Sequence, residues 1–431
     1  MATSPTKATL RAFNVGFGDC FLLSFAYAKD SRHVLIDFGS TRAPPGAAKN
    51  YMADIAAKIG LLTNNKLHMV VATHRHKDHI SGFATTAKGK SSGRIIAGLK
   101  PELVLQPWTE DPDIAEDATG PAAGPRAFVR SLAGMNGFAE QVHRFTADKS
   151  PEQGRKLGFS ESEWNFLGFV GENNVSNKSA VKNLMTMGKR KPRYLHAGQS
   201  ADISSILPGV ELLVLGPPTV DQHPNVSQQK AENAEQYWQL ASMRGVAGGL
   251  DSGGEPGAQP VLFPGHAVAT APHARWAEHR LAKMRKDMLF SMVTALDDAM
   301  NNTSLILLFR AGGKSLLFPG DAQWENWQYA LSNPAYVKLL KEVDLYKVGH
   351  HGSRNATPKS LWKLFNHKHA SKGKKGRLVS VMSTMHNVHG ESAATAVPRQ
   401  TLVDELEKHS HHYSTENVEK GTLFTPIEFE L

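Results

Sequence analysis

The sequence predicts an α/β fold in which two mixed β-sheets pack together and carry helices on their outer sides. Three observations indicate this: β-prone apolar runs open the chain, similar runs return after residue 300, and helical stretches lie between them. An apolar face of a sheet must be buried against another layer, so this order favours a layered sandwich. We expect a single domain over 1–431, interrupted by an insertion of helix and loop at about 219–298.

The N-terminal elements begin with strands and then alternate with a helix. Short β-prone runs separated by turn sequences predict two hairpins, with strands at 8–15, 20–27 and 33–39. Apolar residues that recur at the spacing of one helix face predict a helix at 51–62. The apolar run at 67–74 then predicts a buried strand that ends in a polar loop.

The remaining elements follow from the same two patterns. Apolar runs bounded by glycine, proline or charged residues predict strands at 101–106, 209–216, 304–310, 314–321, 344–351 and 377–383. Helical spacing predicts helices at 128–145, 160–169, 272–300, 323–342, 358–366 and 401–409.

Composition narrows the class of protein. Among the 431 residues there is one cysteine, Cys20, which excludes an intrachain disulfide and a cysteine-rich zinc site. No apolar run approaches the roughly 18–20 residues that span a bilayer, and the first 13 residues lack the apolar core of a secretory signal. We therefore expect a cytoplasmic protein without a membrane segment. The net charge of +9 favours an acidic partner or substrate.

The clearest chemical signal is HRHKDH at 74–79, which follows the predicted strand at 67–74. Imidazole nitrogens and carboxylate oxygens are the ligands that a zinc-like ion prefers, and this loop offers four of them in six residues: His74, His76, Asp78 and His79. A loop at a strand end lets the first two point one way and the last two another. The spacing therefore suits two metal ions rather than one.

HxHxDH after a strand resembles the first metal motif of the metallo-β-lactamase fold superfamily. Three later strand ends extend the resemblance, namely VLIDFG at 34–39, FPGD at 318–321 and VGHHGS at 348–353. Within the superfamily the chain is most similar to the ComEC-like hydrolase branch, through NVGFGD at 14–19, NNTSL at 301–305, HHGS at 350–353, and Ser380-Val381 followed by His389. It departs from that pattern at Met382 and Gly390, where the branch has Gly and Pro.

The resemblance implies a metallo-β-lactamase-like αββα four-layer sandwich and a hydrolase with two divalent ions, zinc or alternatively manganese. His74 and His76 would hold the first ion, and His196, His266 or a water would complete that site. The second ion would be held by Asp78, His79 and one of His350 and His351.

Roles beyond metal binding also follow from the resemblance. Asp321 would bridge the two ions, and Asp19 and Asp37 would support the ligands from behind. We expect Asp78, Asp321 and His389 to act in catalysis, with His389 donating a proton to the leaving group or binding a phosphoryl oxygen.

Basic clusters add a hint about the substrate. We expect Lys372, Lys374 and Lys375 to bind substrate phosphates, because the loop 368–377 joins a predicted helix to the strand that leads to His389. Further clusters lie at 189–193 and at 88–94. With the resemblance, they favour hydrolysis of phosphodiesters in DNA or another nucleic acid. A small-molecule hydrolase acting on a lactone, thioester or β-lactam is the alternative enzyme, and a non-catalytic binding protein that keeps the fold is the alternative outside enzymes.

Overall fold

The computed structural model describes residues 4–86, 91–112, 142–156, 159–174, 177–223, 300–353, 357–386, 388, 397–419 and 421–431. The chain divides into two compact units. Unit 1 comprises Met1–Val129, Ser176–Ser227 and Ala299–Leu431, and unit 2 comprises Arg130–Val175 and Gln228–Asp298. Apart from residues 219–223, the predicted insertion lies outside the described residues, as does all but the last residue of the predicted helix at 272–300.

The described residues of unit 2 include two helices, α5 (Pro151–Lys156) and α6 (Glu161–Asn174). Helix α6 contains most of the predicted helix at 160–169 and continues beyond it. Ser160 shows why the helix starts where it does, because its hydroxyl accepts from the Glu163 backbone N–H while the Glu163 carboxylate accepts from the Ser160 N–H.

The first sheet of unit 1 has seven strands among the described residues, in the order β13-β1-β2-β3-β4-β5-β6. Its strands are β1 (Lys7–Phe13), β2 (Cys20–Ala26), β3 (Ser31–Phe38), β4 (Met69–Val71), β5 (Leu103–Pro107), β6 (Arg193–Leu195) and β13 (Phe424–Glu430). Strands β13, β1, β2 and β3 are antiparallel, and β3 to β6 run parallel. The first sheet is therefore mixed.

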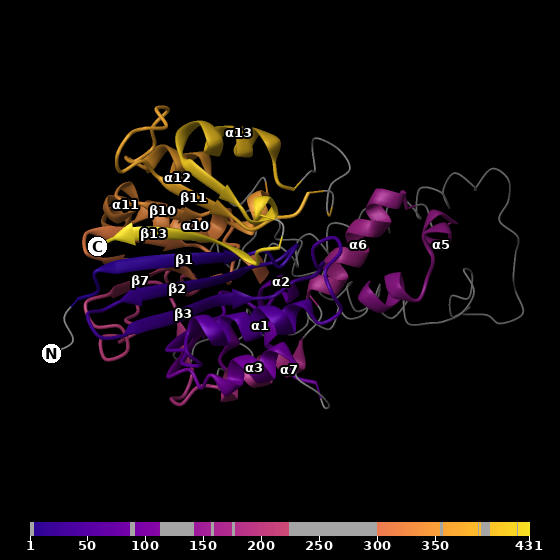
Figure 1. Cartoon of the computed structure of the whole chain (residues 1–431). Coiled ribbons are helices and arrows are strands. Elements are labelled where there is room, and N and C mark those ends of the chain that lie inside the picture. The colour runs from indigo at the N-terminus through magenta and orange to yellow at the C-terminus, as the bar shows by residue number, and fades with distance from the viewer. Residues whose placement is uncertain are drawn as a thin grey trace, which may run out of the picture. The chain divides into compact units, whose positions relative to one another are not determined.

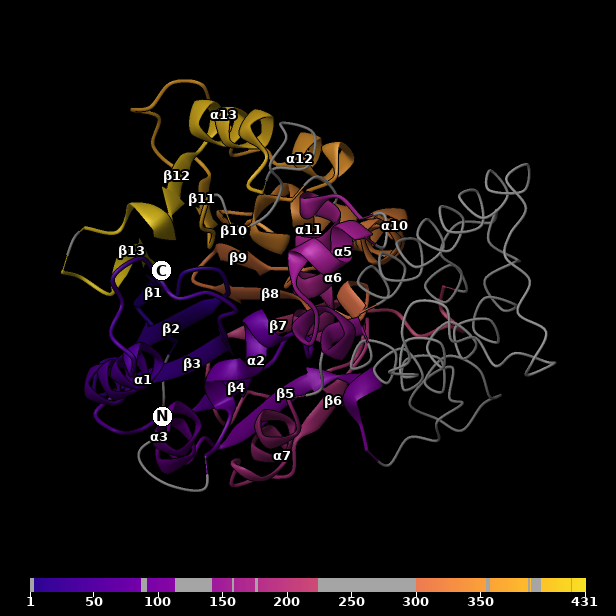
Figure 2. The same cartoon turned by 90° about the vertical axis from the view of Figure 1, so that its right-hand side faces the viewer.

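The second sheet of unit 1 has six strands among the described residues, in the order β12-β11-β10-β9-β8-β7. They are β7 (Glu211–Gly216), β8 (Ile306–Ala311), β9 (Lys314–Phe318), β10 (Leu345–Lys347), β11 (Val379–Met382) and β12 (His411–Ser414). Strands β7, β8 and β9 are antiparallel, whereas β9 to β12 run parallel. Figure 2 shows both sheets from the side on which their strands follow one another in these orders.

The inner faces of the two sheets meet in one apolar core. Phe21 and Phe25 on β2 pack against Phe318 and Phe309, with ring centroids 6.3 Å and 6.4 Å apart. All four side chains are buried, as are the aliphatic residues around them. Burial of this area from water supplies the main force that holds the sheets together.

Helices cover the outer face of each sheet in unit 1 (Figure 1). The first sheet packs against α1 (Tyr51–Leu62), α3 (Ser92–Gly98) and α7 (Lys178–Thr186). The second packs against α10 (Trp324–Ser332), α11 (Pro334–Lys341), α12 (Lys359–Leu364) and α13 (Gln400–His409). Short helical turns are α2 (Lys77–Ile80), η1 (Ser81–Phe83), η2 (Trp108–Glu110), η6 (His350–Gly352) and η7 (Thr415–Asn417).

The predicted α/β fold of two mixed sheets with outer helices is confirmed. One predicted helix, at 323–342, is instead two, because Asn333 accepts from the Ala335 N–H and Pro334 occupies the first helical position of α11. Strands β6, β12 and β13 were not predicted. None of the described helices has both the length and the hydropathy needed to cross a bilayer.

Two buried histidines on the first sheet predict that the fold loses stability in mild acid. Burial, and after it Arg11, lowers the pKa of His33 to about 4, while Asp30 opposes the shift. Burial, followed by Arg32, His33 and Lys66, lowers the pKa of His68 to about 4. The two rings are tied together, since the His33 N–H donates to His68 Nδ1 at 3.0 Å.

Above about pH 6.5 both histidines are neutral in the folded and unfolded states. As the pH falls from 6.5 to 4, the unfolded chain takes up protons that the folded chain refuses, so stability falls by at most about 1.4 kcal/mol per pH unit per histidine. Urea midpoints at pH 7.5 and 5.0 measure the loss. The His33→Gln/His68→Gln variant should lose less over the same interval, and an equal loss would contradict the assignment.

Candidate metal centre

The polar residues predicted from separate motifs converge at one edge of unit 1. Strands β3, β4, β9, β10 and β11 all end there, and β2 begins there, as their parallel and antiparallel pairings require. We call this the carboxyl edge, and the opposite end of the same strands the amino edge. Loops at the carboxyl edge bring Asp19, Asp78, His79, Asp321 and His351 together from both sheets, although the residues are spread over most of the chain.

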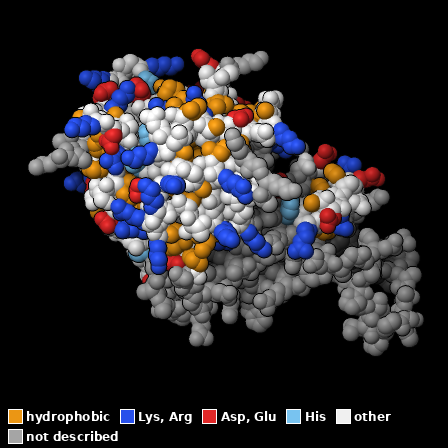
Figure 3. Space-filling model, turned by 60° about the horizontal axis from the view of Figure 1, so that its bottom comes forward, with side chains coloured by type: hydrophobic (Ala, Val, Ile, Leu, Met, Phe, Trp, Pro, Cys, Tyr) orange, Lys and Arg blue, Asp and Glu red, His pale blue; other side chains and the backbone are white. Residues whose placement is uncertain are grey.

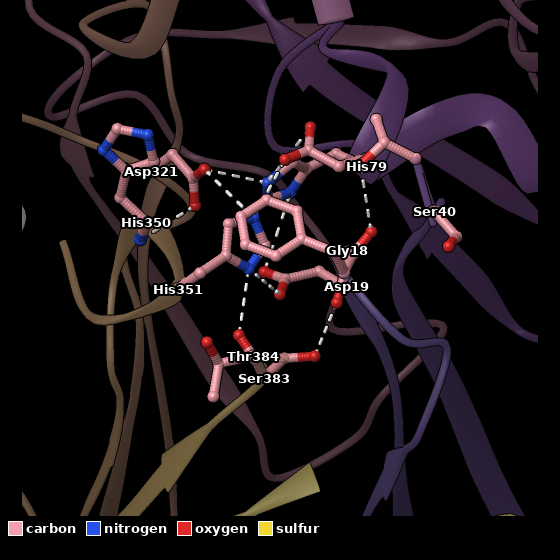
Figure 4. Close-up of polar contacts among 12 residues, drawn as sticks. Gly18, Asp19, Ser40, His79, Asp321, His350, His351, Ser383 and Thr384 are labelled. Carbon is pink, nitrogen blue, oxygen red and sulfur yellow. Dashed lines mark hydrogen bonds and ion pairs between the residues drawn. The ribbon is translucent and has the colours of Figure 1, made fainter. Parts of the chain in front are cut away.

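Four side chains form a compact ligand group. Asp78, His79, Asp321 and His351 are buried, and each offers one ligand atom that lies within 4.8 Å of the other three. His79 Nε2 lies 3.0 Å from Asp321 Oδ2, and His351 Nε2 lies 2.9 Å from Asp78 Oδ2. Figure 4 shows His79, His351 and Asp321 pointing toward one another. We call these four residues the ligand group.

The chemistry of the ligand group fits a divalent cation. Within the described part of the chain, the buried atoms His79 Nε2 and Asp321 Oδ2 make no hydrogen bond. Buried polar atoms are normally partnered, so two such atoms aimed at each other indicate a place for a ligand. Imidazole nitrogen and carboxylate oxygen are the donors that zinc-like ions accept.

Asp37 holds this group from behind. Its Oδ1 accepts from the Thr73 backbone N–H at 2.7 Å, and its Oδ2 accepts from the Thr73 hydroxyl at 2.7 Å. The same Oδ2 lies 2.8 Å from His79 Nδ1, so a proton on Nδ1 leaves Nε2 as the free donor atom toward the ligand group. Asp37 has a φ of 53° at the end of β3, a strained conformation that its hydrogen bonds maintain.

The structure brings His351, rather than His350, into the ligand group. His351 Nδ1 lies 2.9 Å from the Ser383 carbonyl oxygen, which directs Nε2 toward Asp78. His350 contributes its backbone, because its N–H donates to Asp321 Oδ1 at 3.0 Å, while its ring nitrogen Nδ1 lies 2.8 Å from Ser353 Oγ. Both histidines have positive φ, 41° and 53°, so the turn turns the two rings in different directions.

The carboxylates set the protonation of the two histidines in the ligand group. Burial by itself would lower the pKa of His79, but Asp321, Asp37 and Asp78 raise it well above its ordinary value. Burial likewise opposes, and Asp321 and Asp78 outweigh, a raised pKa at His351. A cation that binds here must therefore displace protons.

His74 and His76 are buried beside the ligand group but belong to neither cluster of three or more possible ligands among the described residues. The His74 ring lies 4.7 Å from that of His76 and 4.1 Å from that of His79, centroid to centroid. Burial and the neighbouring histidines lower the pKa of His74 well below its usual range, so the ring is neutral and able to bind a metal.

The candidates for completing the first metal site have different outcomes. His196 follows β6 and is half-buried, with Nδ1 3.0 Å from the Ala197 carbonyl oxygen, and it is outside both ligand clusters. His266 lies outside the described residues, and so does His389, the predicted proton donor.

The basic loop at 368–377 lies at the amino edge, which corrects the expectation that it is tied close to the metal face. The loop leads into the start of β11, whereas the ligand group lies beyond its end, and the four residues of β11 alone span about 13 Å. Lys372, Lys374 and Lys375 are exposed there. Arg377 is buried and donates to the carbonyl oxygens of His369 and Lys408, each at 2.7 Å, so it fixes the loop to the end of α13.

The basic cluster at 189–193 also starts at the amino edge. The Lys189 N–H donates to the Pro101 carbonyl oxygen and the Arg190 N–H to that of Glu102, both just before β5 begins. Within this cluster Lys189 pairs with Glu102 at 2.5 Å and Arg193 pairs with Asp202 at 3.1 Å. These ion pairs reduce the charge that the cluster can offer to a polyanion.

Sequence reasoning missed Lys347 as part of this site. This lysine on β10 is 2% exposed, forms an ion pair with Asp19, and lies 3.4 Å from Asp321 Oδ1. Burial would lower the pKa of Lys347, but Asp19 and Asp321 raise it above its ordinary value, so the side chain is a cation. A lysine inside an otherwise apolar strand was the signal that could have revealed it.

Comparison with known proteins adds no assignment, since no family model matches the chain and no curated protein matches it.

Proposed function

We propose that this chain is a metal-dependent hydrolase with a metallo-β-lactamase-like fold of the ComEC-like type, and that it cleaves phosphodiesters in DNA or another nucleic acid. The observation that carries the proposal is the buried ligand group, whose nitrogen and oxygen atoms lie within 4.8 Å of one another. The layered architecture of unit 1 and the sequence motifs at its carboxyl edge support the same proposal.

In the proposed centre, Asp78, His79, Asp321 and His351 hold one divalent ion. His74 and His76 hold a second, with Asp321 shared between the two. When bound, such ions activate a water for attack and neutralise negative charge on the substrate oxygens. Asp37 keeps His79 Nε2 facing the ligand group, and the Ser383 carbonyl oxygen does the same for His351.

The charges of the site favour two ions rather than one for an anionic substrate. Four buried carboxylates, those of Asp19, Asp37, Asp78 and Asp321, face one buried ammonium, that of Lys347. Three negative charges are thus left without compensation. One divalent ion would leave the site negative and repel a phosphodiester, whereas two would make it positive.

Cations near the carboxyl edge replace the loop at 368–377 as the proposed contacts to substrate phosphates. Arg42 lies beside the Asp19 loop, since its carbonyl oxygen accepts from the Phe17 N–H at 2.8 Å. Arg399 lies beside the turn that carries His351, since its N–H donates to the Gly352 carbonyl oxygen at 2.9 Å.

The helical face over α1, α3 and α7 adds a broader positive surface (Figure 3). Its exposed cations include Lys66, Arg94, Lys100, Lys178 and Lys182. Such a surface would raise the association rate of a polyanion without reading its sequence.

A metal analysis combined with a substrate panel tests the proposal. We expect about two zinc or manganese ions per chain, and hydrolysis of bis(4-nitrophenyl) phosphate and of DNA after loading. Binding of DNA should weaken steeply as salt rises, because phosphate contacts release counterions. A chain that takes up no metal and is not activated by zinc or manganese would overturn the proposal.

The same panel separates the alternatives. Turnover of a chromogenic β-lactam, lactone or thioester without turnover of either phosphodiester would indicate a small-molecule hydrolase. Stoichiometric metal binding without turnover of any substrate would indicate a binding protein that keeps the centre. RNA in the panel, compared with DNA of the same sequence, reports which nucleic acid is preferred.

A further inference from the structure

Lys347 is the most deeply buried cation near the ligand group for which contacts are described. Its Nζ forms an ion pair with Asp19 on the loop before β2, and it donates to the Gly320 carbonyl oxygen at 3.1 Å. Lysines are almost never fully buried unless they are paired. Because Asp19 belongs to the first sheet and β10 to the second, the ammonium joins the two sheets at the carboxyl edge.

The two oxygens of Asp321 have different surroundings. Oδ1 accepts from the His350 N–H at 3.0 Å and lies 3.4 Å from Lys347 Nζ. Oδ2 lies 3.0 Å from His79 Nε2 and 3.8 Å from His351 Nε2, and it makes no hydrogen bond among the described residues. One oxygen is therefore held by the chain, and the other faces the ligand group.

Lys347 also bears on the second cluster of ligand-type residues. Asp19, Asp37 and His79 offer atoms within 4.8 Å of one another and are all buried. Asp37 is already bonded to Thr73 and His79, and Asp19 is paired with the Lys347 ammonium. The chain thus provides its own cation where this cluster would otherwise attract one.

We propose that Lys347 is a positioning residue: its ammonium is a fixed cation between Asp19 and Asp321 that restricts Asp321 to one ligand oxygen. The inference rests on the proposed metal-dependent function. Without the ammonium, the Asp321 carboxylate is free to turn and offer both oxygens to one ion, which raises the coordination number and draws Asp321 away from its shared position.

Cobalt(II) loaded into the metal-free protein tests the inference, because its visible absorption weakens as coordination rises from four to six. Lys347→Met removes the cation but leaves Asp19 buried and unpaired, which threatens the fold. The double variant Lys347→Met/Asp19→Asn removes both charges of the pair. We expect it to recover most of the thermal stability lost by the single variant and to keep an altered cobalt spectrum.

Kinetics on bis(4-nitrophenyl) phosphate give a second readout. Partners behind metal ligands typically contribute 10–100-fold, so we expect kcat of the double variant to fall by roughly that factor with little change in KM. Lys314→Met is the matched control, because Lys314 on the neighbouring strand β9 also pairs with an aspartate, Asp344, at 2.8 Å, but at the amino edge. The control should show the wild-type spectrum and kcat.

The outcomes distinguish failure of this inference from failure of the proposed function. If the wild-type chain binds cobalt and the double variant shows the same spectrum and kcat, Lys347 does not position Asp321. If the wild-type chain binds no cobalt, the metal centre itself is refuted, and the role of Lys347 with it.

Discussion

Asp321→Ala is expected to abolish hydrolysis and to cost more activity than Asp37→Ala. Asp321 Oδ2 belongs to the ligand group, whereas both oxygens of Asp37 are occupied by Thr73 and His79. Loss of a residue behind the ligands typically costs 10–100-fold, and loss of a ligand shared by two ions should exceed that. The measurement is kcat/KM on bis(4-nitrophenyl) phosphate, together with the metal content of each variant.

A thermal unfolding midpoint for each variant separates catalysis from folding, since Asp37 also maintains a strained turn. If Asp37→Ala were the less active of the two while its fold and metal content stayed intact, the roles assigned to these carboxylates would be exchanged.

His351→Ala is expected to remove one metal ion and nearly all activity, whereas His350→Ala should keep both ions. The His351 ring supplies Nε2 to the ligand group, but His350 reaches Asp321 through its backbone N–H, which alanine retains. Metal content after dialysis and the rate with bis(4-nitrophenyl) phosphate measure the difference. Loss of metal from His350→Ala alone, with His351→Ala still loaded, would show that the ligand is His350.

The sequence predicted the fold class because its signals are local. Alternating and continuous apolar runs mark the strands of both sheets, and the helical spacing at 51–62 and 401–409 marks α1 and α13. Strand β6, of three residues, and strand β12, HHYS, are too short or too polar for such a signal. They are strands because neighbouring strands offer them hydrogen-bonding partners.

The residues of the candidate site were also legible in the sequence. Asp78 and His79 lie in one short motif, and Asp321 and His351 each follow an apolar run, which places them at strand ends. The types of side chain and their position after strands indicate metal-binding chemistry before any distance is known. Their convergence into a group within 4.8 Å is a property of the folded chain.

By itself, then, the sequence determined which ligand-type side chains stand at strand ends and how many layers the chain can build. Tertiary structure alone decided which of them meet. The backbone turn at 350–351 selected His351, and the pairing of the two sheets placed Asp19 against Lys347. Strand direction moved Lys372, Lys374 and Lys375 to the amino edge, because residues before a parallel strand lie at the opposite end from those after it. Proximity along the chain is therefore a poor guide to proximity in space once a strand intervenes.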